Sequence, residues 1–242
     1  MKIFSYCASR HKGSYTQQTI EFLLEEINKR TDIELYKYKV NNLNLNACVG
    51  CTLCFYGGVC RNDQYDGFNK IKQQLFSSDV IILASPVYAC SVSGDMKIFI
   101  DRISSHLHLM SLRGKIGIPV LTASNNSLIE TNEYLRKIFN YLGAFVPFTI
   151  MCTVDYPKQF YSKEFREVKI PSYAEEIVSY SNYEKKRLSN RAQELYFTHM
   201  KKQYSTVVGE NYEAEYWKRE EMLKFDTYQE LIDNIMEGKN ND

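Results

Sequence analysis

The pattern of apolar positions divides the first 150 residues into short strands and longer helices. Short apolar or β-rich runs predict five strands, at residues 2–7, 32–40, 79–85, 115–124 and 144–152. Apolar residues that recur at helical spacing predict four helices, at residues 14–30, 66–78, 94–109 and 127–143. The fourth helix has a capping-box start at Ser127 and Glu130 and a glycine stop at Gly143.

This alternation of strands and helices predicts the fold class. Right-handed crossovers between successive strands give an α/β fold with an open, doubly wound parallel sheet of five strands. The run DVIILAS at 79–85 is typical of a strand that is buried on both faces of such a sheet. Ligands of these sheets bind beyond the carboxyl ends of the strands. The loops after the first, third and fourth strands are therefore the candidate binding loops.

The chain changes character after the fifth strand. From Asp155 on it carries ten of the nineteen tyrosines and the only tryptophan, Trp217. We expect helices at about 172–203, 213–225 and 228–237, the last with a capping box of Thr227 and Glu230. The predicted organisation is a sheet domain at 1–152 and a helical arm at 153–242. Exposed aromatic residues at this density favour an oligomer-forming arm, and the alternative is an arm packed on the sheet domain.

Charge and composition exclude several classes of partner. The 242 residues include 30 Lys and Arg against 29 Asp and Glu, so the formal net charge is +1. No excess of either sign points to nucleic acid or to an anionic membrane as partner. The first residues do not read as a secretory signal, and no apolar run reaches the roughly 18 residues of a membrane span. We expect a cytoplasmic protein whose thiols are kept reduced.

Four of the seven cysteines lie within thirteen positions, in the segment ACVGCTLCFYGGVC at 47–60. Their spacing is C-x2-C-x2-C-x5-C, at Cys48, Cys51, Cys54 and Cys60. A reducing compartment and an odd cysteine count argue against disulfides. Structural zinc sites generally pair two knuckles about a dozen residues apart, which this spacing does not. The spacing favours a [4Fe–4S] cluster, and zinc or redox thiols remain open as alternatives. Packed thiols are the default for Cys7, Cys90 and Cys152.

The three candidate binding loops carry groups that suit a mononucleotide. The loop SRHKGSYT after the first strand opens a helix, where backbone N–H groups suit a phosphate. The loop after the third strand offers an aromatic face and hydroxyl donors, and the loop after the fourth offers amides and hydroxyls. The candidate cofactor-binding residues are Ser9, Arg10, His11, Ser14, Tyr15, Thr16, Pro86, Val87, Tyr88, Ser93, Gly94, Ser124, Asn125 and Asn126.

Two of these loops carry a resemblance to a known family. SPVY at 85–88 and SGDMKIFIDR at 93–102 resemble the P-x-Y … K-x-F-I-D-R signature of the flavodoxin-like NAD(P)H-dependent FMN reductase family. SRHKGSYT resembles that family's S-x-R-x-x-G-N-T phosphate loop, although His11 stands in place of the usual arginine and Ser14-Tyr15 replace Gly-Asn. The loop TASNNS lacks the family's usual glycines. The compact cysteine motif is similar to that of the iron–sulfur flavoprotein branch.

The resemblance covers residues 1 to about 152 and implies a function. It implies a flavodoxin-like FMN-binding domain with a [4Fe–4S] cluster held by the four cysteines. Such a protein would be an electron-transfer oxidoreductase, with an electron-carrier protein or NAD(P)H as partner, and would form a homodimer or homotetramer. It also gives Asp101 and Arg102 a place near the flavin or an interface, whereas spacing alone makes Lys97 and Asp101 a helix ion pair.

Two other functions remain open. The protein could be an NAD(P)H-dependent FMN or quinone reductase whose cysteines bind no iron. It could also be a non-catalytic flavin or metal redox sensor that presents its tyrosine-rich arm to a partner.

Overall fold

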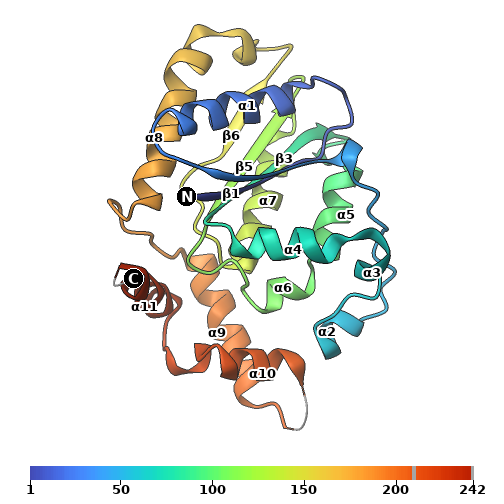
Figure 1. Cartoon of the computed structure of the whole chain (residues 1–242), viewed down its shortest axis with the longest axis vertical. Coiled ribbons are helices and arrows are strands. Elements are labelled where there is room, and N and C mark those ends of the chain that lie inside the picture. Colours follow the sequence, from blue (N-terminus) through green and yellow to red (C-terminus); the bar gives the residue numbers. More distant parts are fainter. Residues whose placement is uncertain (209–210, 241–242) are drawn as a thin grey trace.

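A parallel sheet forms the centre of the molecule, which is described here from a computed structural model covering residues 1–208 and 211–240. Its strands lie in the order β2-β1-β3-β5-β6 (Figure 1). The strands are β1 (Lys2–Cys7), β2 (Glu34–Lys39), β3 (Val80–Tyr88), β5 (Ile116–Ala123) and β6 (Ile150–Thr153). The predicted doubly wound parallel sheet is confirmed. A sixth strand, β4 (Ser91–Val92), pairs antiparallel with the end of β3 and was not predicted.

Helices cover both faces of the sheet. Helix α1 (Tyr15–Asn28) packs with α8 (Ile170–Ser181) on one face. The other face is covered by α4 (Phe68–Ser77), α5 (Gly94–Arg102) and α7 (Leu128–Leu142). Successive residues of β3 alternate between the two cores, and its first seven residues are buried because both faces are covered.

Several predicted boundaries are wrong. The helix expected at 94–109 ends at Arg102, and a separate short helix, α6, spans Ser105–His108. The helix expected at 127–143 has no capping box, because Ser127 has a left-handed backbone (φ +58°) and its side chain makes no capping bond. Gly143 does end that helix, at φ +83°. The fifth strand pairs mainly at 150–153, and only Phe145 of its predicted first half forms a bridge, to Ile116.

The segment between β2 and α4 is mostly irregular. It contains a 3-10 turn (Val40–Asn42) and two short helices, α2 (Leu53–Gly57) and α3 (Asp63–Asp66). Gly67 separates α3 from α4 with a left-handed backbone at φ +68°.

The C-terminal arm consists of more elements than predicted. After a 3-10 turn (Gln159–Tyr161) and a π-helix (Glu164–Lys169) come α8, α9 (Arg191–Ser205), α10 (Tyr212–Arg219), a 3-10 turn (Met222–Lys224) and α11 (Tyr228–Asn240). The helix expected at 172–203 is therefore two helices. The capping box of Thr227 and Glu230 is confirmed by hydrogen bonds in both directions, of 3.3 and 3.2 Å.

The aromatic residues of the arm mostly pack inside the chain. Trp217, Tyr204 and Tyr228 are fully buried in a third core, which also includes Leu109 and Met110 from the sheet domain. The expectation that these aromatics are exposed is therefore wrong. In Figure 1, α9, α10 and α11 form a separate helical layer below the sheet domain. Among the described residues, no helix is long and apolar enough to cross a membrane.

Candidate functional site

A cleft of about 300 Å³ lies at the carboxyl edge of the sheet. The cleft lies at the ends of the neighbouring strands β1 and β3. The chain leaves these two strands toward opposite faces of the sheet, and ligands of this kind of sheet usually bind at such a point. Its walls come from the loops after β1, β3, β5 and β6. The lining residues are Ser9, His11, Ser14, Tyr15, Thr16, Pro86, Val87, Tyr88, Thr122, Ala123, Ser124, Val154 and Asp155.

The loop after β1 forms one end of this cleft and the start of α1. Ser14 caps α1, and its side chain accepts a hydrogen bond from the Gln17 N–H at 3.2 Å. The Thr16 and Thr122 hydroxyls hydrogen-bond each other at 2.6 Å, which joins this loop to β5. The Ser9 hydroxyl is buried and has no hydrogen-bond partner in the protein. A buried, unpaired donor beside a helix N-terminus fits a bound phosphate.

The other end of the cleft has an aromatic wall. Pro86, Val87 and Tyr88 line it at the end of β3, and Tyr88 is 55% exposed. Tyr15 is the second tyrosine that lines the cleft. Its hydroxyl lies 2.5 Å from that of Tyr161, and this hydrogen bond fixes the position of the Tyr15 ring. The cleft thus offers both a phosphate end and a flat apolar wall, which together fit a flavin mononucleotide.

Nine of the fourteen predicted cofactor-binding residues line this cleft, and the structure places the other five elsewhere. Arg10 pairs with Asp95 through two hydrogen bonds of 2.7 and 2.8 Å. Ser93 is buried as the N-cap of α5 and donates to the Ala8 carbonyl at 2.8 Å, with Gly94 following it as the first residue of that helix. Asn125 and Asn126 are exposed beyond the cleft.

Four lining residues, Thr122, Ala123, Val154 and Asp155, were not among the predicted candidates. Thr122 and Ala123 belong to the predicted loop TASNNS, but only Ser124, Asn125 and Asn126 of that loop were chosen. Val154 and Asp155 follow β6 directly, so the carboxyl-edge rule could have found them.

The four motif cysteines line a second, smaller cavity of about 50 Å³. Cys48 is exposed, and Cys51, Cys54 and Cys60 are partly buried. The backbone turns sharply here, with φ of +67° at Gly50 and +60° at Thr52. None of the seven cysteines forms a disulfide.

Four cysteine thiols dominate the donor set of this cavity. In residues 1–208 and 211–240, no three His, Cys, Asp or Glu side chains converge as a preformed site for a single metal ion. A cubane differs from a single ion, because each of its four thiolate ligands binds a different iron atom. Four free thiols around one cavity fit the chemistry of a cluster, and the Asp101 carboxylate, which also lines the cavity, pairs with Lys97.

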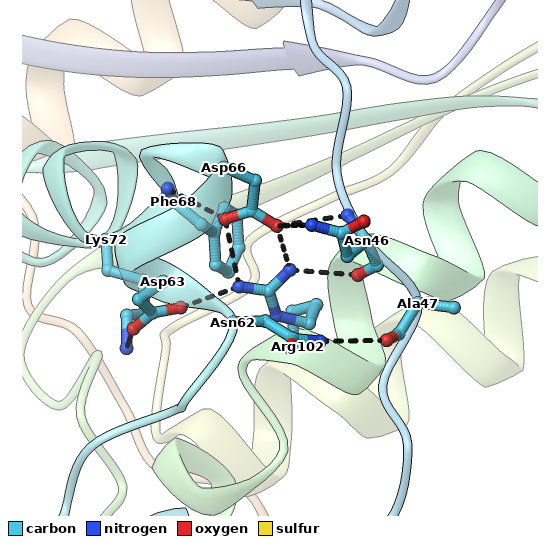
Figure 2. Close-up of polar contacts among 8 residues, drawn as sticks. All are labelled: Asn46, Ala47, Asn62, Asp63, Asp66, Phe68, Lys72 and Arg102. Carbon is cyan, nitrogen blue, oxygen red and sulfur yellow. Dashed lines mark hydrogen bonds and ion pairs between the residues drawn. The ribbon is translucent and has the colours of Figure 1, made fainter.

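Arg102 holds the two ends of the cysteine segment together (Figure 2). Its side chain is fully buried, and its terminal nitrogens contact Asp63 at 2.7 Å, Asp66, and the Asn46 carbonyl at 2.8 Å. Asp66 also accepts from the Asn46 N–H at 3.0 Å. Lys72 completes the network by pairing with Asp63. The chain before Cys48 and the chain after Cys60 are thereby fixed to the end of α5.

The electrostatics keep this network charged. Burial opposes the charged form of Asp66, but hydrogen bonds from Arg102, Asn46 and Phe68 outweigh it and hold the pKa of the carboxyl below its usual value. Burial likewise disfavours the charged guanidinium of Arg102, yet its bonds to Asp66 and Asp63 raise its pKa. Arg102 therefore stays positively charged.

The sequence-derived role of Asp101 and Arg102 is resolved by this geometry. Asp101 pairs with Lys97 at 2.5 Å, as their spacing predicts. Asp101 and Arg102 do not line the cleft at the sheet edge. Both of them line the cysteine cavity instead.

The other cysteines differ from one another. Cys7 and Cys152 are buried, as predicted, and burial raises the pKa of Cys152 to about 12. A thiol with so high a pKa is unreactive near neutral pH. Cys90 is exposed at the turn between β3 and β4, so the expectation of a packed thiol is wrong there.

The helical arm packs against the cysteine segment. Gly58 packs so closely on Tyr212 of α10 that an added Cβ would lie 2.3 Å from the tyrosine ring. The Phe55 ring lies 5.1 Å from that of His108, which bonds to Glu213 at 2.9 Å. The cysteine segment is thus held by α5 on one side and α10 on another.

The strand order and the cleft at the switch point define a flavodoxin-like protein. The sequence profile described as NADPH-dependent FMN reductase matches residues 1–157. The chain belongs to this family of flavin-dependent oxidoreductases, and within it to the iron–sulfur flavoprotein branch.

Individual relatives agree with this assignment. An iron–sulfur flavoprotein of Archaeoglobus fulgidus is 33% identical over 144 residues, which are 59% of this chain and 64% of that protein. One of Methanocaldococcus jannaschii is 30% identical over 142 residues, 58% of this chain and 71% of that protein. The match thus spans less than two thirds of the Archaeoglobus relative. Among solved structures, the apo form of an NADH:FMN oxidoreductase shares the fold, with a TM-score of 0.54, 18% identity, and coverage of 79% of this chain and 92% of that one.

Proposed function

We propose that the protein is an electron-transfer oxidoreductase that binds FMN in the cleft and a [4Fe–4S] cluster at the four cysteines. One observation carries this proposal: four free thiols surround one cavity at the end of α5, while α5 begins next to the loop that forms the phosphate end of the cleft. The nine residues of α5 span about 12 Å, so a single rigid helix connects the two sites.

The residues of the chain would bind and orient the two groups. Ser9 and the first N–H groups of α1 would hold the flavin phosphate, and Pro86 and Tyr88 would lie along the ring. Cys48, Cys51, Cys54 and Cys60 would be the cluster ligands. A flavin exchanges one or two electrons and a cluster exchanges one, so the pair would convert between two-electron and one-electron partners.

The partners follow from this chemistry. A nicotinamide nucleotide would be a two-electron donor to the flavin, and a small electron-carrier protein would exchange single electrons with the cluster. The resemblance of the sequence to iron–sulfur flavoproteins also supports a homodimer or homotetramer, which sedimentation would test.

A second candidate function is a flavin reductase without a cluster. It is favoured by the contacts of Arg102 with the Asn46 carbonyl and of Gly58 with Tyr212, which hold the cysteine segment in place without a cluster. In that case the cysteine segment would serve only as a packed loop between α5 and α10.

The test is a pair of cysteine variants purified without oxygen. Cys51→Ala removes a proposed ligand, and Cys90→Ala removes an exposed thiol outside the motif as a matched control. We expect Cys51→Ala to lose iron and the visible absorbance of the cluster while it keeps FMN, and Cys90→Ala to keep both. Iron content in Cys51→Ala equal to that of wild type would overturn the cluster assignment. FMN in wild type without iron would favour the second candidate.

A further inference from the structure

The buried guanidinium of Arg102 has one N–H that nothing in the protein uses. Its terminal nitrogens are held by Asp63, Asp66 and the Asn46 carbonyl, so the group cannot rotate freely. The Nε atom is buried and has no hydrogen-bond partner. An unpaired buried donor is destabilising, so a fold that retains one generally provides a partner.

The position of Arg102 indicates where that partner belongs. Arg102 lines the same cavity as Cys48, Cys51, Cys54 and Cys60, although its side chain is inaccessible to solvent. The cavity is therefore the space that Arg102 shares with the four thiols. Arg61 also lines this cavity, but it is exposed to solvent.

We propose that Arg102 is a positioning residue for the cluster, and that its Nε–H donates a hydrogen bond to a sulfur atom of the cluster or of a ligating cysteine. This inference rests on the proposed function. The paired charges of Asp63, Asp66 and Lys72 offset that of Arg102, so the network as a whole is close to neutral. The hydrogen bond, rather than an excess of positive charge, is then what acts on the cluster.

The hydrogen bond has a predictable effect on redox behaviour. Hydrogen bonds to the sulfurs of a cluster stabilise its reduced, more negative form and so raise its reduction potential. A lysine at this position keeps the positive charge but has no Nε–H on a planar fork. We therefore expect Arg102→Lys to lower the reduction potential of the cluster, and Arg61→Lys at the exposed arginine to leave it unchanged.

The decisive measurement is pulsed EPR of the reduced cluster in protein labelled with [15N]arginine. We expect a 15N hyperfine coupling in wild type and in Arg61→Lys, and its loss in Arg102→Lys. Because wild type and Arg61→Lys suffice to assign the coupling, the test holds even where Arg102→Lys does not keep its cluster. A wild-type cluster without arginine coupling, or a coupling lost in Arg61→Lys, overturns the role of Arg102 alone. Wild-type protein without iron and sulfide overturns the proposed function as well.

Discussion

Ser9 and Ser5 are both buried serines of the β1 region whose hydroxyls have no hydrogen-bond partner. Only Ser9 lines the cleft. Ser9→Ala should weaken FMN binding about tenfold, because it removes a hydrogen bond to a charged phosphate. Ser5→Ala is the matched control and should leave the affinity unchanged. Titration of the apoprotein with FMN, followed by quenching of flavin fluorescence, measures both; equal affinities in the two variants would contradict the phosphate assignment.

Substitution of Asp63 tests the network of buried ion pairs that holds the cysteine segment. Its carboxylate pairs with Lys72 and Arg102, all three of them buried. Asp63→Ala leaves Lys72 without a charged partner and should lower the free energy of unfolding by about 3–5 kcal/mol. Lys97→Ala breaks an exposed pair with Asp101 and should cost about 0.5 kcal/mol. Urea unfolding of the apoproteins compares them, and similar midpoints would show that the buried network contributes little.

Individual residues of the cleft were predictable where the chemistry is local. Ser9, Ser14 and Thr16 lie in one strand-to-helix turn, so sequence neighbours define that part of the site. The partners of Arg102 lie 36 and 39 residues away at Asp66 and Asp63. No local pattern reports such contacts, and within α5 spacing predicted the Lys97–Asp101 pair instead.

At the scale of elements, the contact between α2 and α10 depends on Gly58. Gly58 and Gly50 both have left-handed backbones, at φ +69° and +67°, but only Gly58 faces another side chain, that of Tyr212. Alanine at either position costs about 1 kcal/mol of backbone strain. Gly58→Ala should be more destabilising than Gly50→Ala, because its Cβ must also displace α10. Thermal unfolding of the two apoproteins measures the difference, and equal midpoints would show that α10 does not brace the cysteine segment.

Element types were more predictable than element ends. The apolar periodicity of 94–109 does not reveal that the helix ends at Arg102. Ile103 lies outside the helix but is buried, so it continues the apolar pattern. Ser127 and Glu130 have the capping-box spacing, but the tight turn after β5 imposes a left-handed backbone on Ser127. In both cases tertiary packing overrides a local signal.

At the scale of the whole molecule, the proposed FMN cleft and the helical layer are separate. The cleft is lined by the sheet domain and the chain just after β6, whereas Trp217 is buried in the core of α9–α11 and donates to the His108 carbonyl at 3.0 Å. Trp217→Ala should cost about 3–5 kcal/mol of stability but leave FMN affinity unchanged at low temperature. Calorimetry and flavin titration of the same sample check this. Loss of FMN affinity in the folded variant would show that the two parts are coupled.

The topology of the sheet was predictable because alternating strands and helices constrain it strongly. The packing of the arm was not, because tyrosine content alone does not distinguish an internal core from an interface between subunits. Tyr204 and Tyr228 lie in an internal core.

We propose that one chain carries both a flavin and an iron–sulfur cluster. The most direct test of this proposal is the content of iron, acid-labile sulfide and FMN in wild-type protein purified without oxygen. We expect about four iron atoms, about four sulfides and about one FMN per chain. FMN without iron and sulfide, or one metal ion without sulfide, would contradict it.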